Sequence, residues 1–403
     1  MISIIDYLQK PLEDYVALLP VDVVVLRTGN RVGLTKSRLQ GTAIARGKVL
    51  LFLDSHCECS SGWLEPLLYE IYKNRTTVSW PMIAKIDPDT FAVSPRNRLD
   101  NGGFDWRLQY IWEKMAEPVK EKPVKSAAFS GGLFAIEREY FYELGAYDKE
   151  MKIWGFENVE LSLRIWTCGG QILLVPCSVV AHVFRESTPY TWPSGIMEII
   201  THNSQRVAHV WLDDYADLFH RFSPDIKGNP FGDITERKHL RQRLQCKSFQ
   251  WYIENVYQTL LPLSPLEGQI YGEVRNTATS KCLDLPEELL RRSYKVQINT
   301  CHPPNSINFN PRFVYTTKKQ LINFLNICVD WVDGTLMYVK CETGAGTWNY
   351  SNKTLEFRYS TRPDHCLDAR SNSKHVTNQP SVVPCDGSKY QRWVIEDVKV
   401  ARF

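Results

Sequence analysis

The sequence predicts an α/β domain followed by an all-β domain, and its 403 residues allow two or three domains. In the first two thirds, apolar runs of strand length alternate with helix-like stretches, which is typical of a parallel sheet covered by helices on both faces. In the last third, short strand-like runs and polar turns replace long helices, and one Cys-x-Asp pattern occurs three times.

The α/β elements can be placed in order along the chain. The apolar residues 21–26 predict a buried strand, and residues 33–45 predict a helix. A second apolar run, residues 49–53, predicts another buried strand, and residues 62–72 predict the next helix. Strand and helix therefore alternate as a layered α/β domain requires.

Changes in composition set the domain boundaries. We place the α/β domain at residues 1–225 and a helical connector, with a basic amphipathic stretch, at residues 226–267. Within the connector, residues 261–265 contain two prolines, which stiffen and extend the chain as a linker does. The all-β domain then covers residues 268–403.

Each Cys-x-Asp pattern begins one repeat of the β domain. The patterns start at Cys282, Cys328 and Cys366, about 40 residues apart, which predicts three equivalent units around one core. Each first cysteine is followed by a second, at Cys301, Cys341 and Cys385. Since one unit alone buries too little apolar surface, we expect one disulfide in each: Cys282–Cys301, Cys328–Cys341 and Cys366–Cys385. Trp393 is the expected core residue of the third unit, whereas residues 310–313 and Trp348 stand near the equivalent positions of the other two.

Composition excludes some classes of function. The net charge of +3, without a dense basic stripe, argues against a nucleic-acid-binding protein. No apolar run reaches the roughly 18 residues that span a bilayer. Eleven cysteines and three glycosylation sequons, at Asn74, Asn349 and Asn352, favour an oxidising compartment. Residues 1–10 do not form a signal peptide, so we expect an N-terminal piece to be missing.

Asp54-Ser55-His56 is the sharpest chemical feature of the first domain. It directly follows the predicted strand 49–53, at an edge where open α/β sheets bind ligands. In extended chain, residues i and i+2 point to one side, so Asp54 and His56 can converge on one divalent ion such as manganese. The alternative is a turn in which Asp54 caps the following helix.

Five segments in order resemble the polypeptide N-acetylgalactosaminyltransferases, retaining enzymes that start mucin-type O-glycans on Ser and Thr. They are LLFLDSHCECSSGWLEPLL from Leu50, GGFDWRLQYIW from Gly102, FSGGLFAI from Phe129, IWGFENVELSLRIWTCGG from Ile153 and CSVVAHVFRESTPYTWP from Cys177. The three Cys-x-Asp repeats resemble the ricin-type lectin of that family. The resemblance covers nearly the whole chain. It implies a GT-A-like fold, with a Rossmann-like mixed sheet that is incomplete at its N-terminus, followed by a ricin B-type β-trefoil lectin.

The resemblance also implies site residues. Asp54, His56 and His182 match the metal ligands and would hold Mn2+. Glu157 and Asn158 match a motif that borders the sugar and acceptor, and they are the candidate catalytic residues. Positions that contact the nucleotide sugar are matched by Arg31, Gly33, Leu34, Ser55, Gly131, Gly132, Trp154, Arg185 and Tyr190. Without the resemblance, Arg31 would be a surface charge, Trp154 a core aromatic residue and His182 a packed residue beside a strand.

The implied reaction transfers GalNAc from UDP-GalNAc to Ser/Thr-rich protein or glycopeptide acceptors in the Golgi lumen of the secretory pathway. Breaking the bond between sugar and diphosphate builds negative charge, which the cation and Arg185 would stabilise. The family's retained configuration is usually explained by front-face attack of the acceptor hydroxyl, with the departing phosphate taking the proton. No dedicated general base is then needed.

For the lectin, the resemblance makes Asp284, Asp330 and Asp368 the candidate residues for binding GalNAc-bearing glycans. The alternative for each aspartate is that it only closes a turn after its cysteine. The resemblance also implies a disulfide between Cys168 and Cys246, which leaves Cys57, Cys59 and Cys177. In the family, the position of Cys177 pairs with a cysteine in a segment that we expect to be missing here.

Three departures from the family lead to a competing hypothesis. The first nucleotide-binding strand is expected to be missing, Phe156 stands where the family has a glycine, and Thr188 stands where relatives often have a histidine. We therefore expect this chain to be weak or inactive as a transferase. It would then be a catalytically silent glycan-binding protein or a structural partner that regulates relatives. Metal-dependent UDP binding would separate the transferase from the lectin.

Overall fold

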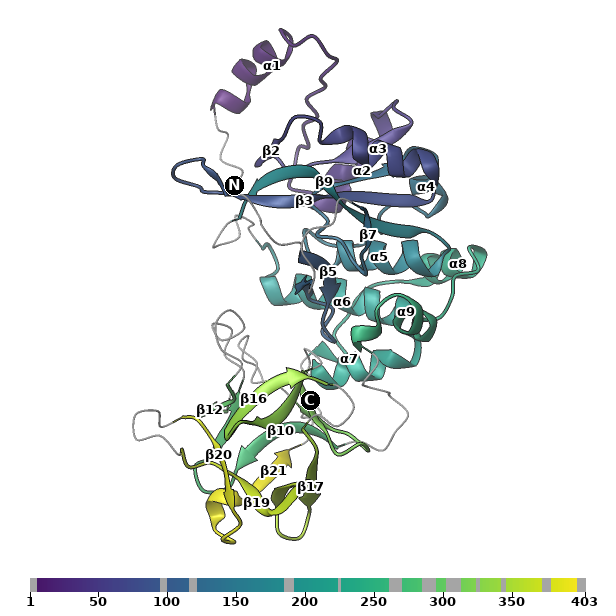
Figure 1. Cartoon of the computed structure of the whole chain (residues 1–403). Coiled ribbons are helices and arrows are strands. Elements are labelled where there is room, and N and C mark those ends of the chain that lie inside the picture. Colours follow the sequence, from purple (N-terminus) through teal and green to yellow (C-terminus); the bar gives the residue numbers. More distant parts are fainter. Residues whose placement is uncertain are drawn as a thin grey trace. The chain divides into compact units, whose positions relative to one another are not determined.

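The computed structural model describes residues 6–94, 100–115, 122–184, 192–223, 226–260, 270–284, 295–301, 313–323, 327–341, 346–371 and 378–396. The chain forms two compact units (Figure 1). The first contains residues 1–103, 112–211 and 230–247, and the second contains residues 104–111, 212–229 and 248–403. This division does not follow the predicted boundaries at 225 and 267. Residues 230–247 of the expected connector belong to the first unit, and residues 104–111 and 212–225 of the expected α/β domain belong to the second. The linker predicted at 261–265 lies outside the described residues.

A mixed sheet forms the centre of the first unit, with strand order β1-β8-β3-β9-β2; β4 pairs with β3 and β7 with β9. The strands are β1 (Val49–Phe52), β2 (Cys57–Cys59), β3 (Thr77–Ile86), β4 (Val93–Ser94), β7 (Val124–Lys125), β8 (Phe134–Glu137) and β9 (Gln171–Val183). Among the described strands of this sheet, β3 and β9 form the only parallel hydrogen-bonded pair. The alternation of strands and helices therefore gave a wrong expectation of a parallel sheet, whereas the mixed sheet implied by the resemblance is present.

The helices of the first unit are α1 (Lys10–Val16), α2 (Leu34–Ile44), α3 (Leu64–Lys73), α4 (Arg138–Glu143), α5 (Glu157–Thr167), α6 (Ile196–Trp211) and α8 (Thr235–Arg243). Helices α3 and α5 lie on opposite faces of the sheet (Figure 1). The helices predicted at 33–45 and 62–72 are confirmed as α2 and α3, and the strand predicted at 49–53 is confirmed as β1. A separate two-stranded sheet pairs β5 (Asp100–Phe104) with β6 (Tyr110–Lys114).

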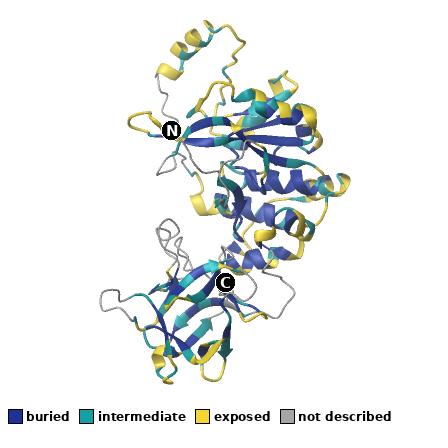
Figure 2. Ribbon diagram, viewed as in Figure 1, coloured by how far each residue is buried: buried dark blue, intermediate teal, exposed yellow. Residues whose placement is uncertain are grey.

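Strand β1 shows why the sheet is covered on both sides. Val49 and Leu51 pack with Leu67 and Ile71 of α3. Because alternate side chains point to opposite faces, Phe52 packs on the other face, where its ring stacks on Phe134 with centroids 4.5 Å apart. The strands at the centre of the sheet are largely buried (Figure 2).

The strand predicted at residues 21–26 does not form, so that prediction is wrong. These residues adopt no regular secondary structure, and Val21 is 65% exposed and Val24 66% exposed. A strand needs a partner for its backbone groups, and within the described residues β1 pairs only with β8. An apolar run alone does not supply such a partner.

The second unit contains the β domain. Its strands are β10 (Ile270–Asn276), β11 (Lys281–Asp284), β12 (Gln297–Thr300), β13 (Phe313–Tyr315), β14 (Leu321–Asn323), β15 (Ile327–Val332), β16 (Thr335–Lys340), β17 (Trp348–Ser351), β18 (Glu356–Tyr359), β19 (Arg362–Asp368), β20 (Ser381–Pro384) and β21 (Trp393–Glu396). Every strand pair among the described residues of this unit is antiparallel. Its α-helices, α7 (Ala216–Phe222) and α9 (Phe249–Asn255), precede these strands.

One aromatic residue from each repeat fills the core of the β domain. Trp393 is fully buried, as predicted, and its Nε1 donates to the carbonyl of Leu367 at 2.9 Å. Trp348 makes the equivalent bond, from Nε1 to the carbonyl of Val329, at 2.9 Å. Phe313 is also fully buried and belongs to the same cluster. The first two repeats therefore keep a core aromatic residue although their sequences depart from the third.

Four disulfides lie within the described chain: Cys168–Cys246, Cys282–Cys301, Cys328–Cys341 and Cys366–Cys385. Cys57, Cys59 and Cys177 are free thiols. The first disulfide fastens the segment after α8 to the end of α5, which explains why this part of the expected connector packs in the first unit. None of the described helices combines the length and apolar character needed to cross a bilayer.

Candidate metal and nucleotide-sugar site

Asp54, His56 and His182 come together at one edge of the sheet. Asp54 and His56 lie in the short segment between β1 and β2, and His182 lies on β9, opposite Cys57 of β2. The N–H of Val183 donates to the carbonyl of His56 at 3.0 Å, so the two histidines are held side by side with ring centroids 4.4 Å apart. One ligand atom from each of the three residues lies within 4.8 Å of the others.

Asp54 is held as an anion. Its Oδ1 accepts from Nη2 of Arg38 at 3.0 Å, and Nε2 of His182 lies 3.6 Å from Oδ2. Burial alone would raise the pKa of Asp54, but His182, Arg38 and His56 together hold this pKa below its ordinary value. The carboxylate is therefore negatively charged near neutral pH and ready to bind a cation.

Arg38 is a site residue that sequence reasoning missed. In addition to Asp54, its guanidinium donates to the carbonyl of Gly131 at 2.6 Å and to the hydroxyl of Tyr147 at 3.1 Å. It therefore links α2, the metal-ligand segment and the turn at Gly131. No motif spacing could have found it, because Gly131 is 93 residues away along the chain.

Gly132 is required because the backbone lies against the candidate metal ligand. A Cβ atom at this position would lie 2.6 Å from Oδ2 of Asp54, which is inside contact distance. The resemblance implied that the backbone approaches the sugar at this turn. In the structure, the nearest group that explains the glycine is the Asp54 carboxylate.

Gly33 and Leu34 lie at the start of α2 and pack on the loop that carries Trp154. Gly33 has φ +88°, and a Cβ atom there would lie 2.5 Å from the Cα of Ile153. The N–H of Leu34 donates to the carbonyl of Ile153 at 2.7 Å. Trp154 follows and is 43% exposed, so it is not the core aromatic residue that its sequence alone would predict.

Glu157 and Asn158 begin helix α5 and are buried. The Glu157 carboxylate accepts from the N–H of Gly155 at 2.9 Å, and the Asn158 amide donates to the carbonyl of Phe129 at 3.0 Å. Burial raises the pKa of Glu157 above its ordinary value, and the nearby charge of Asp54 acts in the same direction, although backbone hydrogen bonds and Arg38 oppose the rise. Both side chains thus bind the backbone of the surrounding loops.

The remaining predicted contacts are only partly placed. Arg31 and Ser55 are exposed, and Ser55 lies between two of the metal-ligand candidates. Arg185 and Tyr190 lie outside the described residues, as does Thr188. The structure thus gathers the metal-ligand candidates into one group and Gly33, Leu34 and the Trp154 loop into another, with Arg38 reaching from α2 to Asp54.

The three aspartates of the β domain have different surroundings. Oδ2 of Asp284 accepts from the neutral amide of Asn299 at 2.6 Å, and Oδ1 of Asp330 accepts from the hydroxyl of Tyr359 at 2.8 Å. Asp368 is fully buried, and its carboxylate is covered by the guanidinium of Arg370, with Nε and Nη2 donating at 2.9 Å and 2.5 Å. The third repeat therefore uses its aspartate within an internal ion pair.

Comparison with known proteins gives three family models that match parts of the chain. The model for glycosyl transferase family 2 matches residues 3–145, and the model for the N-terminal domain of galactosyltransferase matches residues 114–186. The model for the ricin-type beta-trefoil lectin domain matches residues 270–393. The fold and the site together define a glycosyltransferase with a lectin domain.

Individual relatives define the family. Polypeptide N-acetylgalactosaminyltransferase 13 of Rattus norvegicus is 39% identical over 98% of this chain and 71% of its own length. Polypeptide N-acetylgalactosaminyltransferase 6 of Bos taurus is 41% identical over 96% of this chain and 64% of its own length. A crystal structure of GalNAc-T7 with UDP, GalNAc and Mn2+ matches with a TM-score of 0.68 and 32% identity, covering 97% of this chain and 73% of that one.

The chain therefore belongs to the polypeptide N-acetylgalactosaminyltransferase family. Its fold is a GT-A-like glycosyltransferase domain followed by a ricin-type β-trefoil lectin domain, as the sequence implied.

Proposed function

We propose that this chain transfers GalNAc from UDP-GalNAc to Ser or Thr of protein acceptors, with retention of configuration and with Mn2+ as cofactor. The observation that carries the proposal is the convergence of Asp54, His56 and His182 at the sheet edge of a GT-A-like domain. The alternative of a catalytically silent lectin is not favoured, because the relatives reported above are named as transferases.

The donor atoms fit a divalent cation. One carboxylate oxygen and two imidazole nitrogens are available, and Nδ1 of His182 is buried without a hydrogen-bond partner in the described part of the chain. The same donor set also suits iron(II), so the ligands alone do not select the metal. The Mn2+ and UDP in the GalNAc-T7 crystal structure favour manganese. When bound, such a cation would act as a Lewis acid that stabilises charge on a diphosphate leaving group.

The chain's own residues prepare the site for this chemistry. Arg38 fixes Asp54 in place, and it leaves Oδ2 directed toward His182. Trp154, which is partly exposed, provides an apolar surface for the nucleotide sugar, and the exposed Arg31 supplies positive charge for the phosphates. An acceptor hydroxyl that attacks from the front face passes its proton to the leaving phosphate, so neither Glu157 nor Asn158 has to act as a base.

The proposal is tested by measuring GalNAc transfer from UDP-GalNAc to a Thr-rich peptide. We expect transfer with Mn2+ that is abolished by EDTA and restored by adding Mn2+ in excess, and we expect calorimetry to detect UDP binding only with the metal. Restoration by iron(II) but not by manganese would contradict the metal assignment. GalNAc binding without any UDP binding would instead support the silent lectin.

We further propose that the β-trefoil binds GalNAc-bearing glycans through its first repeat. A carboxylate beside a neutral amide, as in Asp284 and Asn299, can receive hydrogen bonds from and donate them to neighbouring sugar hydroxyls. In the third repeat, Arg370 takes the place of such a ligand, since it pairs with both Asp368 and Asp386. Asp330 of the second repeat lies between these two cases: no arginine pairs with it among the described contacts, but the hydroxyl of Tyr359 already donates to its carboxylate.

Two matched substitutions separate these repeats. Asp284→Asn is expected to weaken GalNAc binding about tenfold or more, because it removes the acceptor charge at the sugar hydroxyls. Asp368→Asn is expected to lower the melting temperature while sugar affinity stays unchanged. Titration calorimetry and thermal unfolding give the two readouts. Equal sugar affinity of Asp284→Asn and the unmodified chain would refute the assignment.

We place the protein in the oxidising secretory pathway, with the Golgi lumen as its site of action. Four disulfides support this location, since such bonds persist in oxidising compartments. The sequon residues Asn74 and Asn352 are exposed, which is compatible with glycosylation there.

A further inference from the structure

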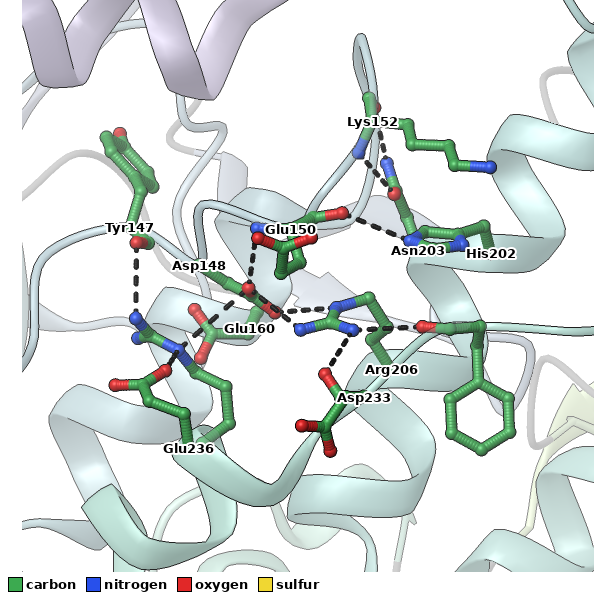
Figure 3. Close-up of polar contacts among 12 residues, drawn as sticks. Tyr147, Asp148, Glu150, Lys152, Glu160, His202, Asn203, Arg206, Asp233 and Glu236 are labelled. Carbon is green, nitrogen blue, oxygen red and sulfur yellow. Dashed lines mark hydrogen bonds and ion pairs between the residues drawn. The ribbon is translucent and has the colours of Figure 1, made fainter.

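A buried asparagine on α6 holds the loop that precedes α5. Asn203 is 1% exposed, and its side chain makes four hydrogen bonds to this loop. Its amide oxygen accepts from the N–H of Lys152 at 2.8 Å, and its amide nitrogen donates to the carbonyls of Lys152, Trp154 and Gly155 at 2.8, 3.2 and 3.0 Å. The two bonds with Lys152 are drawn in Figure 3. One side chain thus binds four polar backbone groups of this loop.

The loop held by Asn203 is in an unfavourable conformation. Ile153 has φ +39° and Phe156 has φ +68°, which is the left-handed region that bulky side chains rarely occupy. Gly155 between them has φ +104°. A short segment with this backbone does not form by local preference. Contacts with the surrounding structure must hold the segment in this conformation, and Asn203 supplies four of these hydrogen bonds.

Neighbouring residues of α6 extend the same attachment. Nε2 of His202 donates to the carbonyl of Glu150 at 3.1 Å, and Arg206 pairs with Asp148 at 2.8 Å (Figure 3). Since these residues lie one turn apart on one face of α6, the helix binds the chain from Asp148 to Gly155 along its length. Helix α6 therefore binds both the loop and the residues that lead into it.

The other side of the loop faces the candidate site. The carbonyl of Ile153 accepts from the N–H of Leu34, and the N–H of Gly155 donates to the carboxylate of Glu157. The partly exposed Trp154 lies between these two contacts. The loop's conformation therefore fixes the relative positions of three parts of the candidate site: the start of α2, the start of α5 and the backbone of Trp154.

We propose that Asn203 is a positioning residue for donor binding and transfer, acting through the Lys152–Phe156 loop rather than by touching substrate. This inference rests on the proposed transferase function for its kinetic consequences. The clamp itself, meaning the four hydrogen bonds between Asn203 and the loop, is independent of that function. Asn203 has the two properties that the role needs. It binds backbone groups of three loop residues, Lys152, Trp154 and Gly155, and it is shielded from water that would compete for these bonds.

The test compares Asn203→Ala with Ser204→Ala. Ser204 is a similarly buried neighbour on α6, and within the described part of the chain its hydroxyl donates to the carbonyl of Thr201 alone. We expect Asn203→Ala to raise amide hydrogen exchange in residues 152–157 by roughly tenfold or more, while exchange in the β domain stays unchanged. In transfer assays, kcat should fall and KM for UDP-GalNAc should rise by about tenfold, whereas KM for the peptide should be unaffected. Ser204→Ala should behave like the unmodified chain.

Asn203→Asp provides a second variant of the same shape in case the alanine variant fails to fold. It keeps the acceptor for Lys152 but loses the donors to the three carbonyls. Burial against carbonyls raises the pKa of the introduced acid, and its protonated form regains one donor, so transfer relative to the unmodified chain should recover as the pH is lowered. Unchanged local exchange in both variants, or equal kinetic losses in Ser204→Ala, would overturn the proposal. If the unmodified chain binds no UDP, the transferase function fails, and the exchange measurement still decides whether the clamp exists.

Discussion

Replacing Asp54 with asparagine is expected to abolish Mn2+-dependent UDP binding and to lower kcat/KM for GalNAc transfer by about 10³-fold or more. The substitution keeps the shape of the side chain but removes the negative charge that faces His182 and His56. Two imidazoles alone hold a hard divalent cation poorly, because such ions prefer charged oxygen ligands. Calorimetry with UDP and Mn2+, followed by steady-state transfer assays, measures both effects.

His182→Ala removes a second ligand from a different strand and should have a similar effect, so the result does not depend on one variant. Asp89→Asn is the matched control, because it removes an exposed carboxylate of the same domain and should leave binding and transfer intact. Thermal unfolding of all three variants separates loss of metal from loss of fold. Full metal-dependent UDP binding by Asp54→Asn would remove the basis of the proposed mechanism.

Asp148→Asn is expected to lower the free energy of unfolding by about 3–5 kcal/mol. Asp148 and Arg206 form a two-bond ion pair, at 2.8 and 3.0 Å, with side chains that are 4% and 2% exposed. Arg206 also donates to the carbonyls of Phe231 and Asp233. Figure 3 shows the pair with Asp148 and the bond to Asp233. The substitution leaves a buried guanidinium without its counter-charge, which accounts for the large cost. Urea unfolding of the two proteins gives the difference.

The same ion pair predicts how the stability difference between the unmodified chain and Asp148→Asn depends on pH. Burial would raise the pKa of Asp148, but Arg206 and Arg237 outweigh it and hold this pKa below its ordinary value. The pair's contribution to the free energy of unfolding is therefore complete above the pKa of about 4 that Asp148 has in the unfolded chain. This contribution is lost as the pH falls through the lower pKa that Asp148 has in the folded protein. The stability difference between the two proteins should narrow in that acidic range.

Glu198→Gln serves as the control for this pair. It breaks the Lys152–Glu198 pair, whose side chains are 41% and 50% exposed, and it should cost at most about 1 kcal/mol. A cost of Asp148→Asn no greater than that of Glu198→Gln would show that the buried pair is not a major source of stability.

Patterns confined to short stretches of sequence were informative for both domains. The Cys-x-Asp repeats indicated three equivalent units, and each unit has its disulfide and a buried aromatic residue. Asp54 and His56 stand two residues apart after a strand, so their convergence follows from the alternation of side chains in extended chain. That His182 joins them was implied only by resemblance, since 126 residues separate it from His56 in the numbering of the chain.

For other patterns, the fold decides which partner a segment or side chain has. The run Val21–Leu26 has the composition of a buried strand, yet it is exposed, because a strand forms only where another strand accepts its hydrogen bonds. Asp368 matches the other two aspartates in sequence, but Arg370 neutralises it inside the third repeat. Neither the exposure of residues 21–26 nor the pairing of Asp368 with Arg370 could be deduced from the residue types at these positions.

The sequence by itself determined the two domains, the triplicate repeat and the chemistry of the Asp54–His56 pair, because these depend on residue spacing within one segment or on repetition of a segment. The tertiary structure alone decided that Arg38 braces Asp54, that Asn203 clamps the loop before α5, and which lectin aspartate is neutralised. These contacts join segments that are distant in sequence. Their geometry is set by the packing of whole elements, which no local pattern encodes.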